Sequence, residues 1–147
     1  MSKIIVKNKR AYFEYEILDK YICGIQLVGS EVKSIRLSNV SILEAYCFVS
    51  NGEMFIKGMH ISEFKQAGTH NNHQPVRDRK LLLKKKEILK IDEKISQKGL
   101  TIIPLTILLS DTGFVKLEIG IAKGKNLYDK RNSLKDKDLK REAEKNI

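Results

Sequence analysis

A basic segment with three consecutive leucines is the part of this chain best suited to bind a polyanion. It runs from Val76 to Lys90, reads VRDRKLLLKKKEILK and holds seven cationic side chains. Because cations bind phosphates and apolar side chains add contact surface, this combination favours an RNA partner. The alternative is a solvated basic helix with one crowded leucine.

The three leucines of this segment cannot all be buried if the segment is a helix. At 100° per residue Leu81 shares one stripe with Ile88 and Ile91, whereas Leu82 lies about 100° away. Either the helix breaks near Lys86, or a leucine, most simply Leu82, faces something other than the core.

The residue types that carry catalysis are sparse in this sequence. Neither His60, His70 nor His73 stands beside a nucleophile and an orienting carboxylate, so the sequence predicts no enzymatic activity. His70 and His73 could share a metal, but no cluster of Cys or His completes the three or four ligands of a zinc site. No metal or cofactor is therefore expected.

The aromatic residues also bear on the mode of RNA recognition. There are five Tyr and five Phe, and no cluster typical of base-stacking RNA-binding proteins is expected on a strand. Recognition of a folded RNA by its shape and phosphates fits better than stacking of several single-stranded bases.

Composition bounds the class of partner. A net charge of +10 on 147 residues favours a polyanion. Charge alone leaves ribosomal RNA, a structured small RNA, DNA and an anionic membrane open, although no helix carries the broad apolar face that a membrane requires. Cys23 and Cys47 are interpreted as reduced core residues, and with no apparent leader or membrane span the protein is expected to be soluble and cytoplasmic.

The elements that position these residues are mostly strands. Alternation predicts a long, bent strand over residues 13–27, with an irregularity near Asp19. A short helix is expected over Gly29–Arg36, capped by Ser30, with Lys33 and Arg36 on its open side.

Two hairpins follow from turn residues and alternation. The first joins Leu43–Val49 to Glu53–Met59 around Asn51-Gly52, a pair typical of a type I′ turn. The second joins residues 101–109 to 114–122, with Pro104 at an edge or bulge. Between the hairpins, Pro75 is expected in the first turn of the basic helix.

The sequence thus predicts a mainly β fold with helices, in which antiparallel strands form a small closed or half-closed barrel. Residues 1–8 are expected to be a flexible arm, residues 9–124 the barrel, and residues 125–147 a basic tail. With few apolar groups, the tail is expected to be disordered when free and helical on a partner.

Four separated motifs resemble, in order, the small protein B family of SsrA-binding proteins. They are GSEVKSIR at 29–36, PVRDRKLLLKKKEI at 75–88, KGLTIIPL at 98–105 and LEIGIAKGKNLYDKR at 117–131. The resemblance implies an OB-like barrel that binds transfer-messenger RNA (tmRNA) and brings it to ribosomes stalled on messages without a stop codon. It implies no covalent chemistry and no small-molecule substrate.

The resemblance also implies two sets of contact residues. On the barrel, the family's contacts with the tRNA-like domain of tmRNA correspond to Ile22, Gly24, Leu82 and Lys116. Neighbouring cations expected to join them are Lys33, Arg36, Arg77, Arg79, Lys80 and Lys84. In the tail, the residues expected to contact the decoding centre and message channel of the small ribosomal subunit are Lys123, Lys125, Tyr128, Asp129, Lys130 and Arg131.

This chain departs from the family pattern in places, and two other functions remain open. The family often has Glu-Ala-Gly where this chain has Ile22-Cys23-Gly24, and His where this chain has Tyr128. The alternatives are a ribosomal or general RNA-binding OB-fold protein, and a purely protein–protein adaptor.

Overall fold

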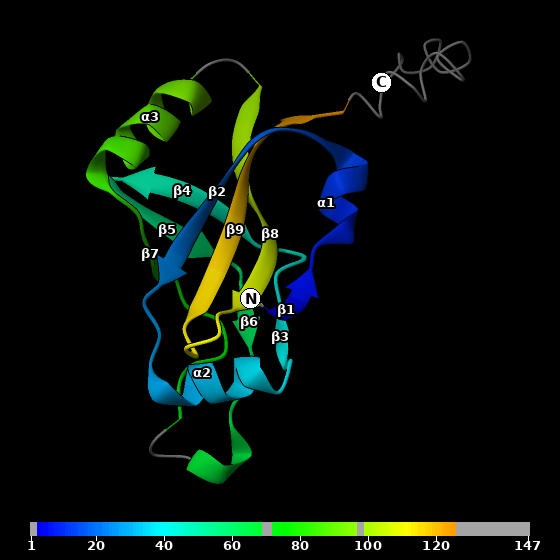
Figure 1. Cartoon of the computed structure of the whole chain (residues 1–147), viewed down its shortest axis with the longest axis vertical. Helices are drawn as coiled ribbons and strands as arrows, with labels where there is room; N and C mark the ends of the chain where they lie inside the picture. Colours follow the sequence, from blue (N-terminus) through cyan, green and yellow to red (C-terminus); the bar gives the residue numbers. More distant parts are fainter. Residues whose placement is uncertain (1–2, 69–71, 97–98, 126–147) are drawn as a thin grey trace, which may run out of the picture.

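The chain folds into a mainly β structure with helices at its periphery (Figure 1). The computed structural model describes residues 3–68, 72–96 and 99–125. Its strands are β1 (Lys3–Lys7), β2 (Tyr15–Ile25), β3 (Val40–Ser41), β4 (Tyr46–Ser50), β5 (Glu53–Lys57), β6 (His60–Ile61), β7 (Arg79–Leu82), β8 (Leu100–Leu109) and β9 (Val115–Gly124). Its helices are α1 (Lys9–Glu14), α2 (Gly29–Arg36), the short 3-10 helix η1 (Lys65–Ala67) and α3 (Lys85–Ile95).

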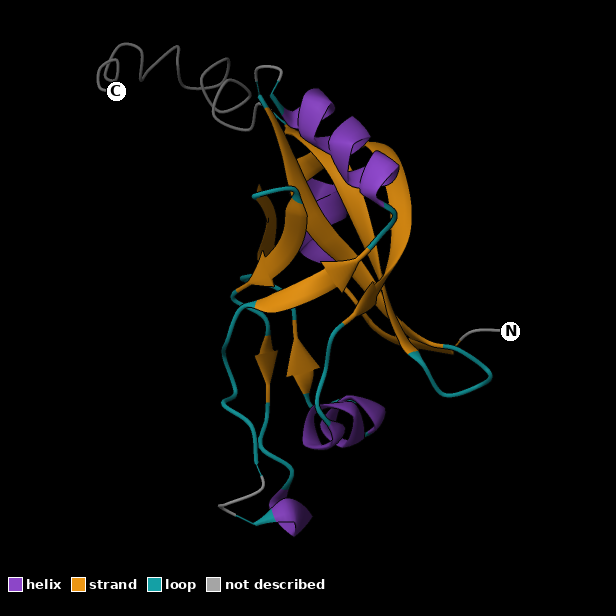
Figure 2. Cartoon of the chain, turned by 90° about the vertical axis from the view of Figure 1, so that its left-hand side faces the viewer, coloured by secondary structure: helices purple, strands orange, loops and turns teal. Residues whose placement is uncertain are grey.

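Seven antiparallel strands make a sheet that closes on itself. Their order is β1-β8-β4-β5-β7-β2-β9, and β9 also pairs with β8, so six strands form a ring with β1 added outside it. Figure 2 shows these strands curving around a common interior, with the small β3–β6 sheet below. The predicted mainly β, closed architecture is confirmed.

Residues 1–8 were predicted to be a flexible arm, but among the described residues, 3–7 are not free. Lys3–Lys7 forms β1 and pairs with β8, from Lys3 opposite Leu109 to Lys7 opposite Thr106. The side-chain Nδ2 of Asn8 then donates to the Pro104 carbonyl at 3.1 Å, and its backbone N–H donates to the Leu105 carbonyl at 2.7 Å. Backbone N–H and C=O groups of β8 that would otherwise lie at an open sheet edge thus form hydrogen bonds with this segment. The polarity of residues 1–8 does not reveal this long-range pairing.

Several local predictions are confirmed. The β2 strand has its register shift between Ile17 and Asp19, and β8 has one after Pro104. Asn51 and Gly52 have φ angles of 52° and 76°, as a type I′ turn requires. α2 covers the predicted residues, and its cations are exposed.

The basic segment is not one helix, and Pro75 does not begin a helical turn. Val76 bridges His60, Arg79–Leu82 is strand β7, and a helix begins only at Lys85. β7 pairs with β5 and β2, so tertiary hydrogen bonds outweigh the local helical preference of Leu and Lys. The three leucines predicted an interruption of the helix, and in the structure the segment changes from strand to helix before Lys85.

The core fills the interior of the ring. Every second residue of β9 from Val115 to Ile121 points inward, and Ile88 and Ile91 of α3 cover one end. Cys23 and Cys47 are buried and free, as predicted, and burial raises the pKa of the Cys23 thiol to about 12. No helix within the described residues is long and apolar enough to cross a membrane.

Candidate RNA-binding surface

Three of the predicted contact residues lie in one row across three strands. Gly24 of β2 is the cross-strand partner of Leu82 on one side and of Lys116 on the other. A Cβ added to Gly24 would lie 3.4 Å from both Cβ and Cδ1 of Leu82, so the glycine lets that leucine lie close over β2. Ile22 is two residues along β2, on the same outer face.

This row lines a groove of about 680 Å³ on the outside of the ring. Ile22 and Leu82 are 53% and 49% exposed, whereas the neighbouring Leu81 is 1% exposed. The residues that line it are Ile22, Cys23, Gly24, Gly52, Glu53, Lys80, Leu81, Leu82, Leu83, Lys84, Lys85, Glu87, Ile88 and Lys116. The structure thus brings together six of the ten predicted barrel contacts, namely Ile22, Gly24, Lys80, Leu82, Lys84 and Lys116.

The charge at the groove is predominantly positive. Four lysines and two glutamates line it. The Lys80 ammonium lies 2.9 Å from Oε2 of Glu53, and Glu87 accepts a hydrogen bond from the Lys84 amide at 3.1 Å. Lys84 and Lys85 stand at the N-terminus of α3, where the helix dipole disfavours cations. Because they do not stabilise the helix there, these lysines are well placed to attract a phosphate.

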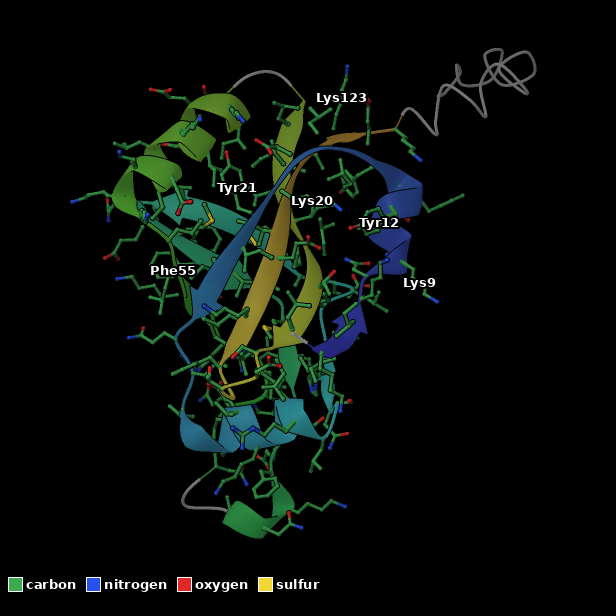
Figure 3. The ribbon with its side chains drawn as sticks, in the orientation of Figure 1. Lys9, Tyr12, Lys20, Tyr21, Phe55 and Lys123 are labelled. Carbon is green, nitrogen blue, oxygen red and sulfur yellow. The ribbon has the colours of Figure 1, made fainter. Side chains whose placement is uncertain are left out.

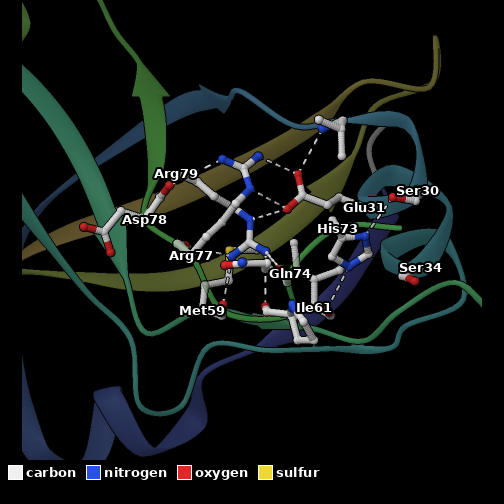
Figure 4. Close-up of polar contacts among 12 residues, drawn as sticks. Ser30, Glu31, Ser34, Met59, Ile61, His73, Gln74, Arg77, Asp78 and Arg79 are labelled. Atoms are coloured by element: carbon white, nitrogen blue, oxygen red, sulfur yellow. Dashed lines mark hydrogen bonds and ion pairs between the residues drawn. The ribbon is translucent and has the colours of Figure 1, made fainter. Parts of the chain in front are cut away.

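Arg79 is not a contact residue, contrary to the prediction. Its side chain is fully buried, and its Nε donates to Oε2 of Glu31 at 2.7 Å (Figure 4). One of its terminal nitrogens donates to the Met59 carbonyl at 2.8 Å. A strand residue whose side chain points inward cannot reach a ligand outside the ring, so Arg79 is a structural residue that joins β7 to α2.

Glu31 is the centre of this buried ion-pair network. Arg77, which is about one third exposed, donates to both carboxylate oxygens, at 3.0 and 2.8 Å. Burial raises the pKa of Glu31, but the hydrogen bonds from Arg77, the Val28 amide and Arg79 outweigh it and hold that pKa below its usual range. The carboxylate therefore stays ionised and anchors the start of α2.

Ser30 was predicted to cap α2, but it does not. The cap residue is Val28, whose amide donates to Glu31 at 2.9 Å, while the Ser30 hydroxyl lies 2.8 Å from Nδ1 of His73. The other ring nitrogen of His73 lies 2.9 Å from the Ile61 carbonyl oxygen. His73 is buried and structural, and His70 lies outside the described residues.

The two cations of α2 lie apart from the groove. Nζ of Lys33 lies 5.6 Å from the centre of the Phe64 ring, and a terminal nitrogen of Arg36 donates to the Gly113 carbonyl at 3.4 Å. Figure 1 shows α2 at the end of the ring opposite α3. The structure does not bring these predicted residues together with Leu82.

Of the predicted tail contacts, only Lys123 and Lys125 lie within the described residues. Lys123 is near the end of β9, where Figure 3 labels it. The Lys125 amide donates to the Glu14 carbonyl at 2.9 Å and its ammonium to the Tyr12 carbonyl at 3.2 Å. Tyr128, Asp129, Lys130 and Arg131 lie outside the described residues, as does the predicted helix of the tail.

Leu83 and Lys85 line the groove but were not predicted as contacts. Both belong to the basic segment, and predicting a strand that ends before Lys85 would have placed them beside Leu82.

In residues 3–68, 72–96 and 99–125, no group of three or more His, Cys, Asp or Glu side chains could hold a metal ion.

Comparison with known proteins identifies the family. The family described as SmpB protein matches residues 5–147. The chain belongs to the SmpB family. The resemblance inferred from the four motifs is therefore confirmed.

Curated relatives support membership in the SmpB family along nearly the whole chain. An SsrA-binding protein of Phocaeicola vulgatus is 48% identical over 97% of this chain and 95% of its own length. Another, of Prochlorococcus marinus, is 50% identical over 95% of this chain and 84% of its own. The similarity thus includes the groove strands as well as the helices.

A solved structure supports the fold. The matching chain, described as "tmRNA-SmpB: a journey to the center of the bacterial ribosome", is 39% identical and has a TM-score of 0.70. The match covers 82% of this chain and 84% of that chain. The ring-like sheet is therefore shared with an SmpB protein of known structure.

Proposed function

We propose that this chain is an adaptor that binds tmRNA and delivers it to stalled ribosomes, where incomplete chains are tagged and released. The row of Leu82, Gly24 and Lys116 carries this proposal, because it places an exposed apolar residue and a cation on one groove in a chain of the SmpB family. Relatives with the name SsrA-binding protein and a solved tmRNA-SmpB structure support this choice of RNA.

The groove is proposed to hold the RNA by contact and charge. Ile22 and Leu82 offer an apolar surface to the sugar and base edges, while Lys80, Lys84 and Lys116 face the phosphates. Such a surface binds and positions RNA, and we assign no chemical step to it. The protein is proposed to act in the cytoplasm, where tmRNA and ribosomes meet.

The tail is proposed to act at the ribosome rather than at the groove. The tail was predicted to begin at residue 125, but Lys125 is hydrogen-bonded to α1, so the proposal concerns the residues that follow it. This part of the tail would be disordered in the free protein and would form a helix in the message channel of a ribosome that lacks message. Lys123, Lys125, Tyr128, Asp129, Lys130 and Arg131 would contact ribosomal RNA there.

A competition experiment tests the choice of RNA. The affinity of the full chain for tmRNA is compared with its affinity for an ordinary tRNA, each measured from 50 to 200 mM salt. We expect a clear preference for tmRNA, and an affinity that falls steeply with salt because bound phosphates release counterions. Equal affinities would indicate a general RNA-binding protein, and a flat salt response would favour a protein partner.

A further inference from the structure

Three aromatic side chains form a continuous array on the outer face of the β4–β5 hairpin. The ring centres of Tyr46 and Phe48 are 6.3 Å apart, and those of Phe48 and Phe55 are 5.6 Å apart with an interplanar angle of 24°. Phe48 and Phe55 are direct cross-strand partners. Tyr46, at the end of the array, is 47% exposed.

The aromatic array is not needed for the core. The alternate residues of the same strands, Cys47, Met54 and Ile56, point into the ring and are at most 4% exposed. Cross-strand packing of Phe48 and Phe55 stabilises the hairpin by a fraction of a kcal/mol to about 1 kcal/mol. That cross-strand packing does not involve Tyr46, whose ring remains half exposed at the end of the array.

Lysines flank both ends of the aromatic array. Lys57 is the cross-strand partner of Tyr46, and Lys80 is the partner of Phe55 on β7. Lys80 also lines the groove, so the array continues that surface around the ring. Rings bordered by cations are typical of surfaces on which bases stack while the backbone meets positive charge.

We propose that the aromatic array stacks on an unpaired base of the RNA that the groove binds, with Lys57 and Lys80 facing the adjoining phosphates. The identity of that RNA rests on the proposed function. The inference reverses the expectation of no base-stacking cluster on a strand. The rings come from two strands and meet only when the hairpin forms.

A double substitution tests the stacking. Phe48→Leu with Phe55→Leu in the full chain keeps apolar bulk and charge but removes the rings. We expect affinity for the tRNA-like domain of tmRNA to fall roughly fivefold to a hundredfold, the effect of losing about one stacked base. The slope of log affinity against log salt should not change, because no cation is lost.

Phe13→Leu is the matched control, since Phe13 is 67% exposed on α1. Figure 3 places Phe55 and the α1 residue Tyr12 on opposite sides of the ring, so the control is remote from that substituted ring. Of the array, only the unsubstituted Tyr46 lines a pocket with α1 residues. If the double variant and Phe13→Leu bind the RNA equally well, the proposal is wrong.

A fluorescent variant keeps the test decisive if the double variant folds poorly. The chain contains no Trp, so Tyr46→Trp introduces a single reporter at the exposed end of the array. Stacking of a base should quench its emission when the tRNA-like domain is added. Unchanged emission at saturating RNA would overturn the proposal.

Two further results distinguish base stacking on the array from RNA binding in the groove and from an interface between two copies. If Leu82→Ala binds normally while the double variant is weakened, stacking stands and the groove assignment fails. If the double variant changes the sedimentation of the free protein from dimer to monomer and leaves RNA affinity unchanged, the array is instead an interface between two copies.

Discussion

Leu81 and Leu82 are adjacent in sequence but have opposite environments. Leu81 is 1% exposed and packs in the core, whereas Leu82 is 49% exposed beside Gly24. The cause is the alternation of a strand, because neighbouring side chains point to opposite faces. The helical geometry that singled out Leu82 was wrong, although its conclusion that Leu82 faces away from the core is confirmed.

Leu82→Ala should weaken RNA binding without unfolding the protein. Removing a half-exposed side chain leaves no core cavity, but it removes the apolar contact at the centre of the groove. We expect the affinity for the tRNA-like domain to fall at least about fivefold, or ~1 kcal/mol. Leu37→Ala, at a leucine that is 59% exposed beside α2, is the control. Unfolding of the Leu82 variant with normal binding at permissive temperature would assign Leu82 to the core.

Glu31 should make stability depend on pH. Its pKa in the folded protein is depressed, so its contribution to stability is present above the unfolded pKa of ~4.3 and is lost as pH falls through the folded pKa. Glu31→Gln should lower the melting temperature at pH 6, because Arg79 loses its buried partner, and should flatten the decline towards pH 3.

Asp19→Asn is the matched control for Glu31→Gln. The Lys94 hydrogen bond lowers the pKa of Asp19 as well, but both side chains of that pair are partly exposed. Its effect on the melting temperature should therefore be much smaller. Equal pH profiles for the two variants would show that the buried network does not control acid stability.

At the scale of elements, the junction of β7 and α3 organises the groove. β7 presents Lys80 and Leu82 outward, and Lys84 and Lys85 follow where the chain turns into α3. A strand, a turn and a helix N-terminus thus place cations around one apolar side chain. A single basic helix would have spread the same charges around its axis.

The cations at this junction should dominate the salt dependence. Lys84→Gln with Lys85→Gln should reduce the slope of log affinity against log salt by up to about two. Lys33→Gln with Arg36→Gln removes two positive charges from α2 and should change the slope less. An equal change in both pairs, measured by titration at several salt concentrations, would mean that the bound RNA extends to α2.

At the scale of the whole molecule, the ring separates two surfaces. Lys116 lies at the groove, and Gly124, eight residues further along β9, ends that strand. At ~3.3 Å per residue this stretch of β9 places Gly124 up to roughly 26 Å from Lys116. The proposed contacts with tmRNA and with the ribosome therefore need not compete for space.

Truncation after Tyr128 should separate the two proposed activities. Affinity for the tRNA-like domain should remain nearly unchanged, because the groove is intact. Tagging of stalled chains in a reconstituted translation system should be abolished. A large loss of RNA affinity in this truncation would mean that the principal RNA contacts lie in the tail.

The sequence alone determined the features that depend on neighbouring residues. These include the hairpin turn at Asn51-Gly52, the bend near Asp19, the extent of α2 and the family, because dihedral preferences, alternation and ordered motifs are all local. Tertiary structure decided what depends on long-range pairing. Pairing with β2 and β5 made Arg79–Leu82 a strand, buried Arg79 against Glu31 and turned Leu82 outward, because a strand's hydrogen bonds come from distant segments that its own residues do not specify.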